Sequence, residues 1–224
     1  MNLTEWLKIY GDICSDLGIV PQDDYESSVN LSVILGGDSS MSVLEKYYGG
    51  TYWVIGGGKN LSRSIDMVEG GRTIVADSAL GTFIDNIGIP DIVVTDLDSE
   101  ISRLVDASEN GSLLVIHAHG DNRDLISRYS RNFYGKVIGT TQNMPLENVF
   151  NFFGFTDGDR SAYLAHHLKA ESINLIGFDF ENPAPKEGSD PDRKLVKLKW
   201  ARKLLNNLAM ERGKEFVDGD LIIL

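Results

Sequence analysis

Short apolar runs rich in β-branched residues recur along the chain, and each is followed by a polar loop containing Gly, Asp or His. These runs predict strands at residues 31–35, 52–55, 73–76, 92–95, 113–116, 136–138 and 173–176. The segments between them are long enough for helical crossovers, which is typical of a parallel sheet. Because ligands bind beyond the carboxyl ends of the strands in open α/β sheets, we expect the polar loops to form one site.

Helices flank the predicted sheet. Apolar residues have helical spacing over residues 3–17, and the polar run at 21–28 then interrupts this pattern. We therefore divide the chain into an N-terminal helical cap, residues 1–28, packed on one α/β domain, residues 29–224. The predicted fold class is α/β and Rossmann-like, with a mostly parallel sheet flanked by helices.

The end of the chain adds a loop, a helix and an edge element. Residues 181–192 form a polar loop with three prolines, which we interpret as a lid. A helix with apolar residues at 195, 198, 201, 205 and 208 follows. After an Asp-Gly turn, residues 221–224 are predicted to form a hairpin or an added edge strand.

The composition is that of an acidic globular protein. The 224 residues are 42% hydrophobic and carry a formal net charge of −12. This charge argues against binding to nucleic acid or anionic membranes, because such surfaces collect Lys and Arg. The single cysteine, Cys14, allows no intrachain disulfide, and no apolar run approaches the roughly 20 residues that span a bilayer. With no basic and apolar leader at the start, we expect a cytoplasmic location.

An aspartate pair follows the apolar run at 92–95, in the segment TDLDS at 95–99. Magnesium prefers carboxylate oxygens, and one or two carboxylates together with substrate phosphates and water complete its octahedron. Asp96 and Asp98 are therefore candidate metal ligands. The alternative is that these aspartates and Ser99 cap a helix or turn, which is common after strands.

A histidine-rich loop, HAHGDN at 117–122, follows the run at 113–116. Strand periodicity places His117, His119 and Asp121 on the same side. A pair of histidines with this spacing can bind zinc, but no cysteine lies nearby and the other two histidines lie in a helix-like segment. Contact with phosphates, or hydrogen bonds at the end of the sheet, is the favoured interpretation.

A third polar segment, GFTDGDR at 154–160, precedes an alanine-rich helical run. Asp157 and Asp159 offer metal ligands, Arg160 offers a positive charge, and the start of the helix offers free backbone N–H groups. These features suit a polyphosphate. An aspartate helix cap beside a solvated arginine is the alternative.

The glycine run GGGKN at 56–60 fits neither common nucleotide motif. It lacks the spacing and the final Ser or Thr of a P-loop, and Leu61 occupies the place of the last glycine of G-x-G-x-x-G. Asp77 ends the next predicted strand, where a ribose-binding acid is expected. A dinucleotide site is therefore only weakly supported.

Taken in order, ADSA at 76–79, TDLDS at 95–99, HAHGDN at 117–122, GTTQ at 139–142 and GFTDGDR at 154–160 resemble the motifs of archaeal-type 6-hydroxymethyl-7,8-dihydropterin pyrophosphokinases. The resemblance covers most of the chain. These enzymes are similar in turn to thiamin pyrophosphokinases, whose aspartate pair after a strand looks like TDLDS. The chain lacks the K-D-x-T-D segment of the thiamin enzymes and has HAHGDN in its approximate place, which weakens thiamin as the substrate.

The resemblance implies a magnesium-dependent reaction in which the pterin hydroxymethyl oxygen attacks the β-phosphorus of ATP and AMP leaves. Asp96 and Asp98 match the family's metal-binding carboxylates, and the predicted catalytic residues are these two and Asp121. Asp121, water or the phosphate itself would accept the hydroxyl proton. The residues predicted to surround the nucleotide and metal are Asp77, His119, Asn122, Thr140, Gln142, Asp157, Asp159 and Arg160. By residue type, Gln142, Asn143, Tyr52 and Phe155 are candidates for contact with the pterin.

Two other classes of function stay open. A transferase that uses a nucleotide sugar also needs an aspartate pair after a strand, and a regulatory domain would bind a nucleotide without turnover. The cluster of aspartates argues against the regulatory domain, because carboxylates gathered without a metal are electrostatically costly. The predicted partners are ATP and a pterin, without nucleic acid or membrane, and the sequence allows both a monomer and a homo-oligomer.

Overall fold

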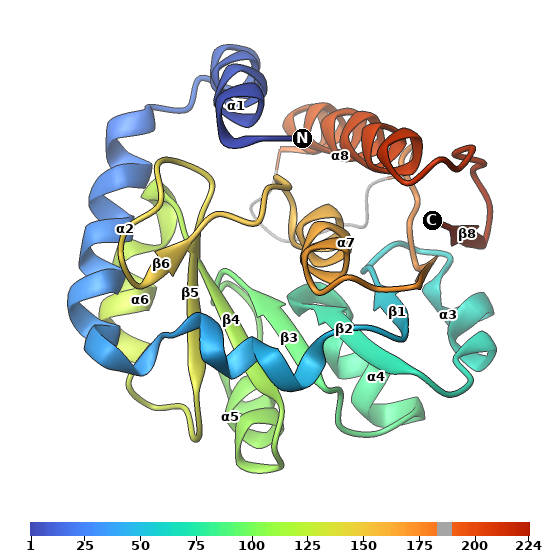
Figure 1. The fold of residues 1–224 in the computed structure, drawn as a ribbon, viewed down its shortest axis with the longest axis horizontal. Helices are drawn as coiled ribbons and strands as arrows, with labels where there is room; N and C mark the ends of the chain where they lie inside the picture. The colour runs from blue at the N-terminus through green and yellow to red at the C-terminus, as the bar shows by residue number, and fades with distance from the viewer. Residues whose placement is uncertain (183–189) are drawn as a thin grey trace.

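One central sheet organises the described part of the chain in the computed structural model (Figure 1). The structure describes residues 1–182 and 190–224. The eight-stranded sheet has the order β6-β5-β4-β3-β2-β1-β7-β8, and only the β7–β8 pair is antiparallel. The strands are β1 (Thr51–Ile55), β2 (Arg72–Ala76), β3 (Ile92–Thr95), β4 (Leu113–Ala118), β5 (Val137–Thr141), β6 (Val149–Phe150), β7 (Ser172–Ile176) and β8 (Leu221–Ile223).

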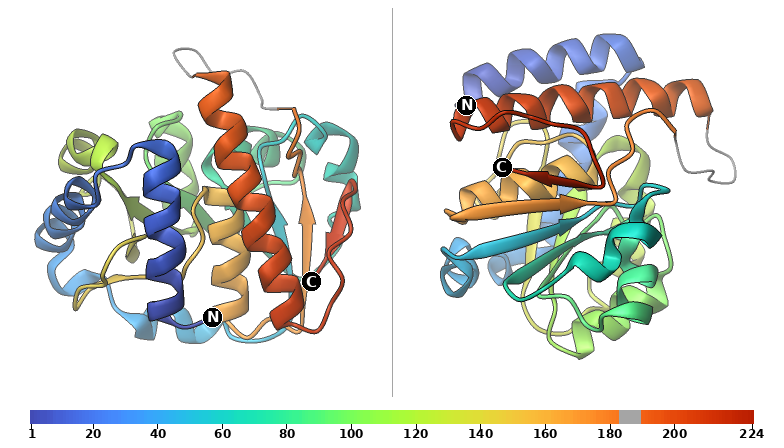
Figure 2. Two further views of the ribbon diagram at one scale, coloured as in Figure 1. Left: turned by 90° about the horizontal axis from the view of Figure 1, so that it is seen from above. Right: turned by 90° about the vertical axis from the view of Figure 1, so that its right-hand side faces the viewer.

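Helices cover both faces of the sheet. On one face lie α1 (Leu3–Leu17), α7 (Asp157–His167) and α8 (Pro191–Glu211), with α1 and α8 side by side above α7 (Figure 2). On the other face lie α3 (Leu61–Ser64), α4 (Leu80–Asn86), α5 (Ile101–Glu109) and α6 (Arg123–Tyr129). The helix α2 (Pro21–Leu35) runs along the β5–β6 side of the sheet, against α6. The predicted α/β class is confirmed.

Two apolar cores lie on the two faces of the sheet, because side chains alternate along each strand. Tyr52 and Val54 of β1 belong to the core beneath α1, α7 and α8, whereas Trp53 and Ile55 belong to the opposite core. These four side chains are all buried, which explains why residues 52–55 form a continuous apolar run rather than an alternating one.

The predicted strand at 31–35 is wrong, because these residues end α2. Val20 is the N-cap residue of this helix, and Pro21 begins it, a position that suits proline because no backbone N–H is needed there. Leu31 and Leu35 are one helical turn apart and pack in the same core. Residue 28, the predicted end of the N-terminal cap, lies within α2, and the division at 28 stays a prediction.

The remaining strand predictions are confirmed at β1, β2, β3, β4, β5 and β7, and the two-residue strand β6 had not been predicted. The C-terminal segment forms the edge strand β8, antiparallel to β7. The predicted lid at 181–192 lies largely outside the described residues. Among the described helices, none has the length and apolar character needed to cross a membrane.

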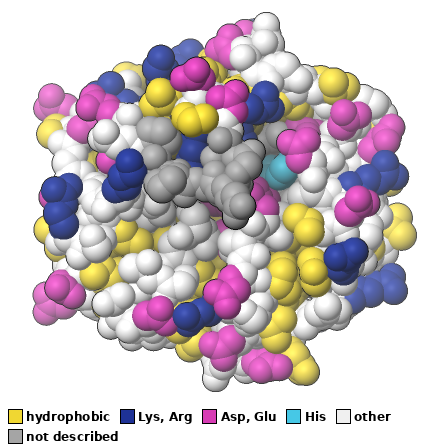
Figure 3. Space-filling view, turned by 180° about the vertical axis from the view of Figure 1, so that it is seen from behind, with side chains coloured by type: hydrophobic (Ala, Val, Ile, Leu, Met, Phe, Trp, Pro, Cys, Tyr) yellow, Lys and Arg dark blue, Asp and Glu magenta, His cyan; other side chains and the backbone are white. Residues whose placement is uncertain are grey.

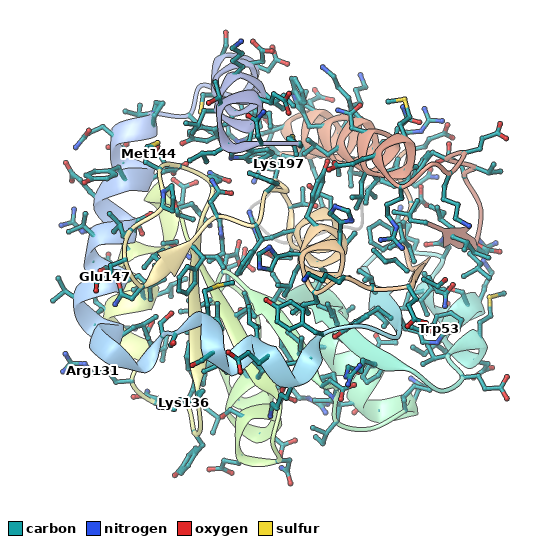
Figure 4. All side chains as sticks on the ribbon, in the orientation of Figure 1. Trp53, Arg131, Lys136, Met144, Glu147 and Lys197 are labelled. Atoms are coloured by element: carbon teal, nitrogen blue, oxygen red, sulfur yellow. The ribbon has the colours of Figure 1, made fainter. Side chains whose placement is uncertain are left out.

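The reversal of strand order places loops from distant parts of the chain at one end of the sheet. The chain proceeds from β1 outward to β6 and then returns to place β7 on the other side of β1. Met144, after β5, lies beside the upper end of α2, whereas Lys136, before β5, lies at the opposite end of the strand (Figure 4).

On the face shown in Figure 3, acidic and basic side chains are interspersed.

Candidate active site

Three carboxylates meet at the carboxyl ends of β2 and β3. Asp77 follows β2, and Asp96 and Asp98 follow β3. One ligand oxygen from each lies within 4.8 Å of the others, with Asp77 buried, Asp96 partly buried and Asp98 exposed. Parallel pairing of β2 and β3 brings these residues together despite their separation in sequence. The prediction that the loops after these strands converge is therefore confirmed.

The backbone between the aspartate pair has an uncommon conformation. Leu97 has a φ angle of 67°, in the left-handed region that few residues other than glycine adopt. Its side chain is fully buried in the core between the sheet and the helices α4 and α5. Its N–H donates to Thr95 Oγ1 at 2.8 Å. Burial of Leu97 and this hydrogen bond together offset the cost of the conformation, which is typical of functional turns.

Asp77 is held by two hydroxyl groups. Thr95 Oγ1 donates to one carboxylate oxygen and Ser99 Oγ donates to the other. Burial raises the pKa of Asp77 to about 6, although both hydroxyl groups favour the ionised form and oppose the shift. The negative charges of Asp96 and Asp98 raise it further. A cation in this cluster would therefore stabilise the ionised carboxylate.

His119 contacts the aspartate pair from the neighbouring strand. Its Nε2 lies 3.3 Å from Asp96 Oδ2. Its Nδ1 accepts from the backbone N–H of Asp121 at 3.3 Å, so the neutral ring carries its proton on Nε2, facing Asp96. Burial acts to raise the pKa of Asp96, but the hydrogen bond from His119, helped by the positive charge of Arg160, outweighs it and lowers that pKa well below its usual range. Asp96 is therefore an ionised carboxylate.

The start of α7 adds a fourth carboxylate and a buried arginine. Arg160 Nη1 lies 2.8 Å from Asp157 Oδ1, and its Nη2 donates to the backbone oxygen of Phe155 at 2.7 Å. Burial and the negative charge of Asp96 raise the pKa of Asp157, and Arg160 opposes this shift. The helix α7 contacts β2 and β3, and the predicted contact of Asp157 and Arg160 with a nucleotide or metal stays a prediction.

Asp159, also at the start of α7, is a helix cap. Its carboxylate accepts from the N–H groups of Phe155 at 2.6 Å and Thr156 at 2.8 Å. The side chain is fully buried. The cap interpretation of this residue is confirmed, and its predicted contact with a nucleotide or metal stays a prediction.

The charge balance of the site favours a bound cation. Four carboxylates, those of Asp77, Asp96, Asp98 and Asp157, face one arginine and one histidine. Carboxylate oxygens at this spacing are the ligands that magnesium prefers. Among the residues that the structure describes, the one group with metal-ligand spacing contains no histidine, so the structure does not support the zinc interpretation.

Three other residues predicted to contact the nucleotide form hydrogen bonds within the protein. Asn122 Nδ2 donates to the backbone oxygens of Asp96 at 2.8 Å and His117 at 2.7 Å, and Asn122 is 1% exposed. Thr140 Oγ1 donates to a backbone oxygen of β4, and the Gln142 amide donates to a carboxylate of α2. Their described contacts order the loops, and contact with a nucleotide stays a prediction for all three.

The histidine loop separates into a buried and an accessible half. His117 is buried, and burial, helped by the charge of Arg160, lowers its pKa well below the usual value, so the ring is neutral. Its Nδ1 lies 3.1 Å from Thr140 Oγ1, whose own proton points elsewhere, so Nδ1 is the donor. Asp121 is exposed on the short turn Gly120–Asn122, outside the carboxylate cluster.

Two details of the sequence interpretation change. Tyr52 lies near the amino end of β1, where its hydroxyl donates to the backbone oxygen of Tyr47, so the proposal that it contacts a ligand at the carboxyl ends is wrong. Gly57 packs against Ser78, and a side-chain carbon there would lie 2.2 Å from Ser78 Oγ. The glycine run therefore allows the loops after β1 and β2 to approach each other closely.

The sequence analysis missed a polar stripe on α2 that contacts these loops. Asp24, Ser27 and Ser28 are buried on one side of this helix. Their spacing of three and four residues is helical, and this was the available signal, but the lack of apolar residues concealed it.

Comparison with known proteins identifies relatives over nearly the whole chain. A family profile described as "6-hydroxymethylpterin diphosphokinase MptE-like" matches residues 27–184. A protein named 6-hydroxymethyl-7,8-dihydropterin pyrophosphokinase from Methanocaldococcus jannaschii is 34% identical over 97% of this chain and 100% of its own length. Proteins of the same name from Pyrococcus furiosus and Methanothermobacter thermautotrophicus are 36% and 33% identical, each over 92% of this chain and 93% and 94% of their own lengths.

Proposed function

The chain belongs to the MptE-like 6-hydroxymethylpterin diphosphokinases, a family of diphosphotransferases, and we propose that it transfers the terminal diphosphate of ATP to 6-hydroxymethyl-7,8-dihydropterin. The observation that supports this most directly is the aspartate cluster at the ends of β2 and β3. In the reaction, the hydroxymethyl oxygen forms a bond to the β-phosphorus, and the bond between that phosphorus and the oxygen bridging to the α-phosphate breaks. The products are the pterin diphosphate, AMP and a proton.

Asp96 and Asp98 would hold magnesium, with Asp77 as the third carboxylate of the cluster. Bound there, the ion would offset the negative charge of the ATP phosphates and of the phosphorus under attack. Asp96 suits this role because its carboxylate is ionised and fixed by His119. Asp77 suits it because two hydroxyl groups fix its orientation and because its burial favours a neighbouring positive charge.

The start of α7 would receive the phosphates. The N-terminus of an α-helix carries a partial positive charge and free N–H groups, which favour anions. Arg160 adds a full positive charge there and is fixed at both ends of its guanidinium group. Since these groups are already ordered, little reorganisation is needed when the phosphates bind.

Asp121 is our proposal for the residue that accepts the hydroxyl proton. It is exposed, its backbone N–H donates to His119, and it follows β4, the strand next to β3. Because the described contacts of Asp121 leave its exposed side chain outside the carboxylate cluster, it can face an incoming acceptor rather than the metal.

A product assay tests the proposed function. The protein is incubated with ATP, magnesium and 6-hydroxymethyl-7,8-dihydropterin, and the nucleotides and pterins are separated by chromatography. We expect AMP and the pterin diphosphate in equal amounts, with no product when EDTA replaces magnesium. Formation of ADP in place of AMP would contradict diphosphate transfer. Two parallel reactions test the alternatives. Thiamin in place of the pterin tests a thiamin pyrophosphokinase, and a nucleotide sugar in place of ATP tests a sugar transferase.

A further inference from the structure

Asp24 of α2 is a buried carboxylate with no place in the reaction described above. It is 2% exposed, and three groups from different segments donate to it. The Gly120 N–H donates to Oδ1 at 2.7 Å, the Tyr10 hydroxyl donates to Oδ2 at 2.6 Å, and the Gln142 amide also donates to Oδ2. A buried carboxylate with this many donors is ordered, and so are the groups that donate to it.

Gly120 links Asp24 to the aspartate pair, because the preceding residue, His119, contacts Asp96. Gly120 has no side chain, and a side-chain carbon at this position would lie 2.8 Å from Asp23 Cβ. This absence lets α2 pack directly on the turn that carries His119. The neighbouring His119 then meets Asp96 at 3.3 Å. A shift of the Gly120 turn caused by a substitution at Asp24 would therefore also move His119, which contacts the predicted metal ligand Asp96.

Two serines extend the same stripe along α2. Ser27 Oγ donates to Asn122 Oδ1 at 3.4 Å, and Ser28 Oγ donates to Thr141 Oγ1 at 2.7 Å. Asn122 in turn donates to the backbone oxygen of Asp96. The stripe thus contacts the loops after both β4 and β5. A buried helix face usually packs by apolar side chains, so this polar half of α2 serves the loops rather than the core.

We propose that Asp24 is a positioning residue for diphosphate transfer: from α2 it orients the turn that carries His119 and the loop that carries Gln142, without touching the substrates. This inference rests on the proposed function. Burial lowers the pKa of Arg160, and the negative charge of Asp24 opposes this shift together with the larger effects of three other aspartates, Asp157, Asp159 and Asp96. Asp24 therefore connects the N-terminal helices to both charged sides of the site.

The test uses Asp24→Asn with Asp23→Asn as the matched control. Both residues lie in the first turn of α2, so each substitution removes the same charge from the same end of the helix, but Asp23 is exposed. In Asp24→Asn, the new NH2 group faces either the Gly120 N–H or the Tyr10 hydroxyl and Gln142 amide, so in each orientation at least one loop loses its acceptor and shifts. Because small displacements of catalytic groups cost roughly 10-fold to 100-fold in rate, we expect kcat to fall by about this factor. The KM for magnesium-ATP should change less than about 3-fold, since no proposed ligand is removed.

A double variant distinguishes positioning from general stabilisation. In Asp24→Asn/Gln142→Glu, the carboxylate and amide exchange places, so the hydrogen bond between α2 and the loop after β5 is restored and the net charge is unchanged. We expect kcat of the double variant to exceed that of either single variant. Equal or lower kcat in the double variant would overturn the proposal, as would wild-type kcat in folded Asp24→Asn. If Asp24→Asn does not fold, Tyr10→Phe removes one donor to Asp24, and an unchanged kcat there would also overturn it.

A readout independent of turnover separates this inference from the proposed function. In ¹⁵N spectra of the histidine side chains, wild-type His119 should show one tautomer, protonated on Nε2, because Nδ1 accepts from the Asp121 N–H. We expect Asp24→Asn to shift these signals toward a mixture of tautomers, with no such change in Asp23→Asn. Unchanged signals in Asp24→Asn would contradict positioning through this turn. Absence of AMP formation by the wild-type protein would instead refute the proposed function.

Discussion

Asn122→Asp should destabilise the protein strongly although the two side chains have nearly the same shape. In the native protein, Asn122 Nδ2 donates to two backbone oxygens, those of Asp96 and His117, at 2.8 and 2.7 Å. A carboxylate oxygen in the place of Nδ2 cannot donate, so both hydrogen bonds are lost and three oxygen acceptors face each other. The site is 1% exposed, so water does not replace the lost donors.

The expected loss of unfolding free energy follows from the two backbone oxygens that lose their donor. Leaving a buried polar group without its partner costs roughly 1–3 kcal/mol, so the two together cost about 2–6 kcal/mol of unfolding free energy. For a domain of this size, such a loss lowers Tm by roughly 10 °C. The assay is urea unfolding followed by circular dichroism. An m-value equal to that of the wild-type protein shows that the variant unfolds in the same transition.

The matched control is Asn86→Asp at the end of α4. Asn86 is exposed, and its Nδ2 donates to the backbone oxygen of Thr82 at 2.8 Å, where water can replace it. We expect this change to cost less than about 1 kcal/mol, including the unfavourable charge at a helix C-terminus. If Asn122→Asp costs no more than the control, Asn122 does not hold the two loops together, and the reasoning is refuted.

Three further predictions concern the site and its support. Asp96→Asn and Asp98→Asn should each lower kcat by roughly 100-fold or more in the AMP assay, because each removes a negative charge that would hold magnesium; wild-type turnover in both would contradict their role as metal ligands. Arg160→Met should cost about 3–5 kcal/mol in urea unfolding, because it leaves the partly buried Asp157 carboxylate and the Phe155 backbone oxygen without their partner. Trp6→Phe should cost roughly 1–2 kcal/mol in the same assay, since the indole N–H donates to the Gln142 backbone oxygen at 2.8 Å.

The strands and the aspartate cluster were predictable because both depend on local patterns. Buried parallel strands have continuous apolar sequences, and the residues that follow them lie at one edge of the sheet whatever the exact order of strands. Asp77, Asp96 and Asp98 could therefore be expected to lie near one another. The two-residue strand β6 has too short an apolar run to be recognised.

The helix α2 could not be predicted from its own residues. Its polar first half packs on polar loops, and its last five residues alone read as an apolar strand. Short apolar runs do not distinguish helix from strand, so the prediction failed where tertiary contacts decide. Asp24 was missed for the same reason, because its partners Gly120 and Gln142 lie 96 and 118 residues away in sequence.

Residue type also failed to separate ligand contacts from internal ones. Asn122, Thr140 and Gln142 were expected beside the nucleotide, but their described hydrogen bonds are formed within the protein. A polar side chain after a strand can serve either purpose, since loops near a site need ordering as much as the ligand needs contacts. Only the burial and partners of each side chain, which depend on the folded chain, distinguish the two uses.

The position of the transferred label tests diphosphate transfer most directly. The protein is mixed with ATP labelled with ³²P at the γ-phosphate, magnesium and 6-hydroxymethyl-7,8-dihydropterin, and the products are separated. We expect the label in the pterin diphosphate, one unlabelled AMP for each molecule of it, and no labelled inorganic phosphate. Labelled pterin monophosphate with ADP, or labelled inorganic phosphate alone, would show transfer of one phosphoryl group or hydrolysis and would contradict the proposed function.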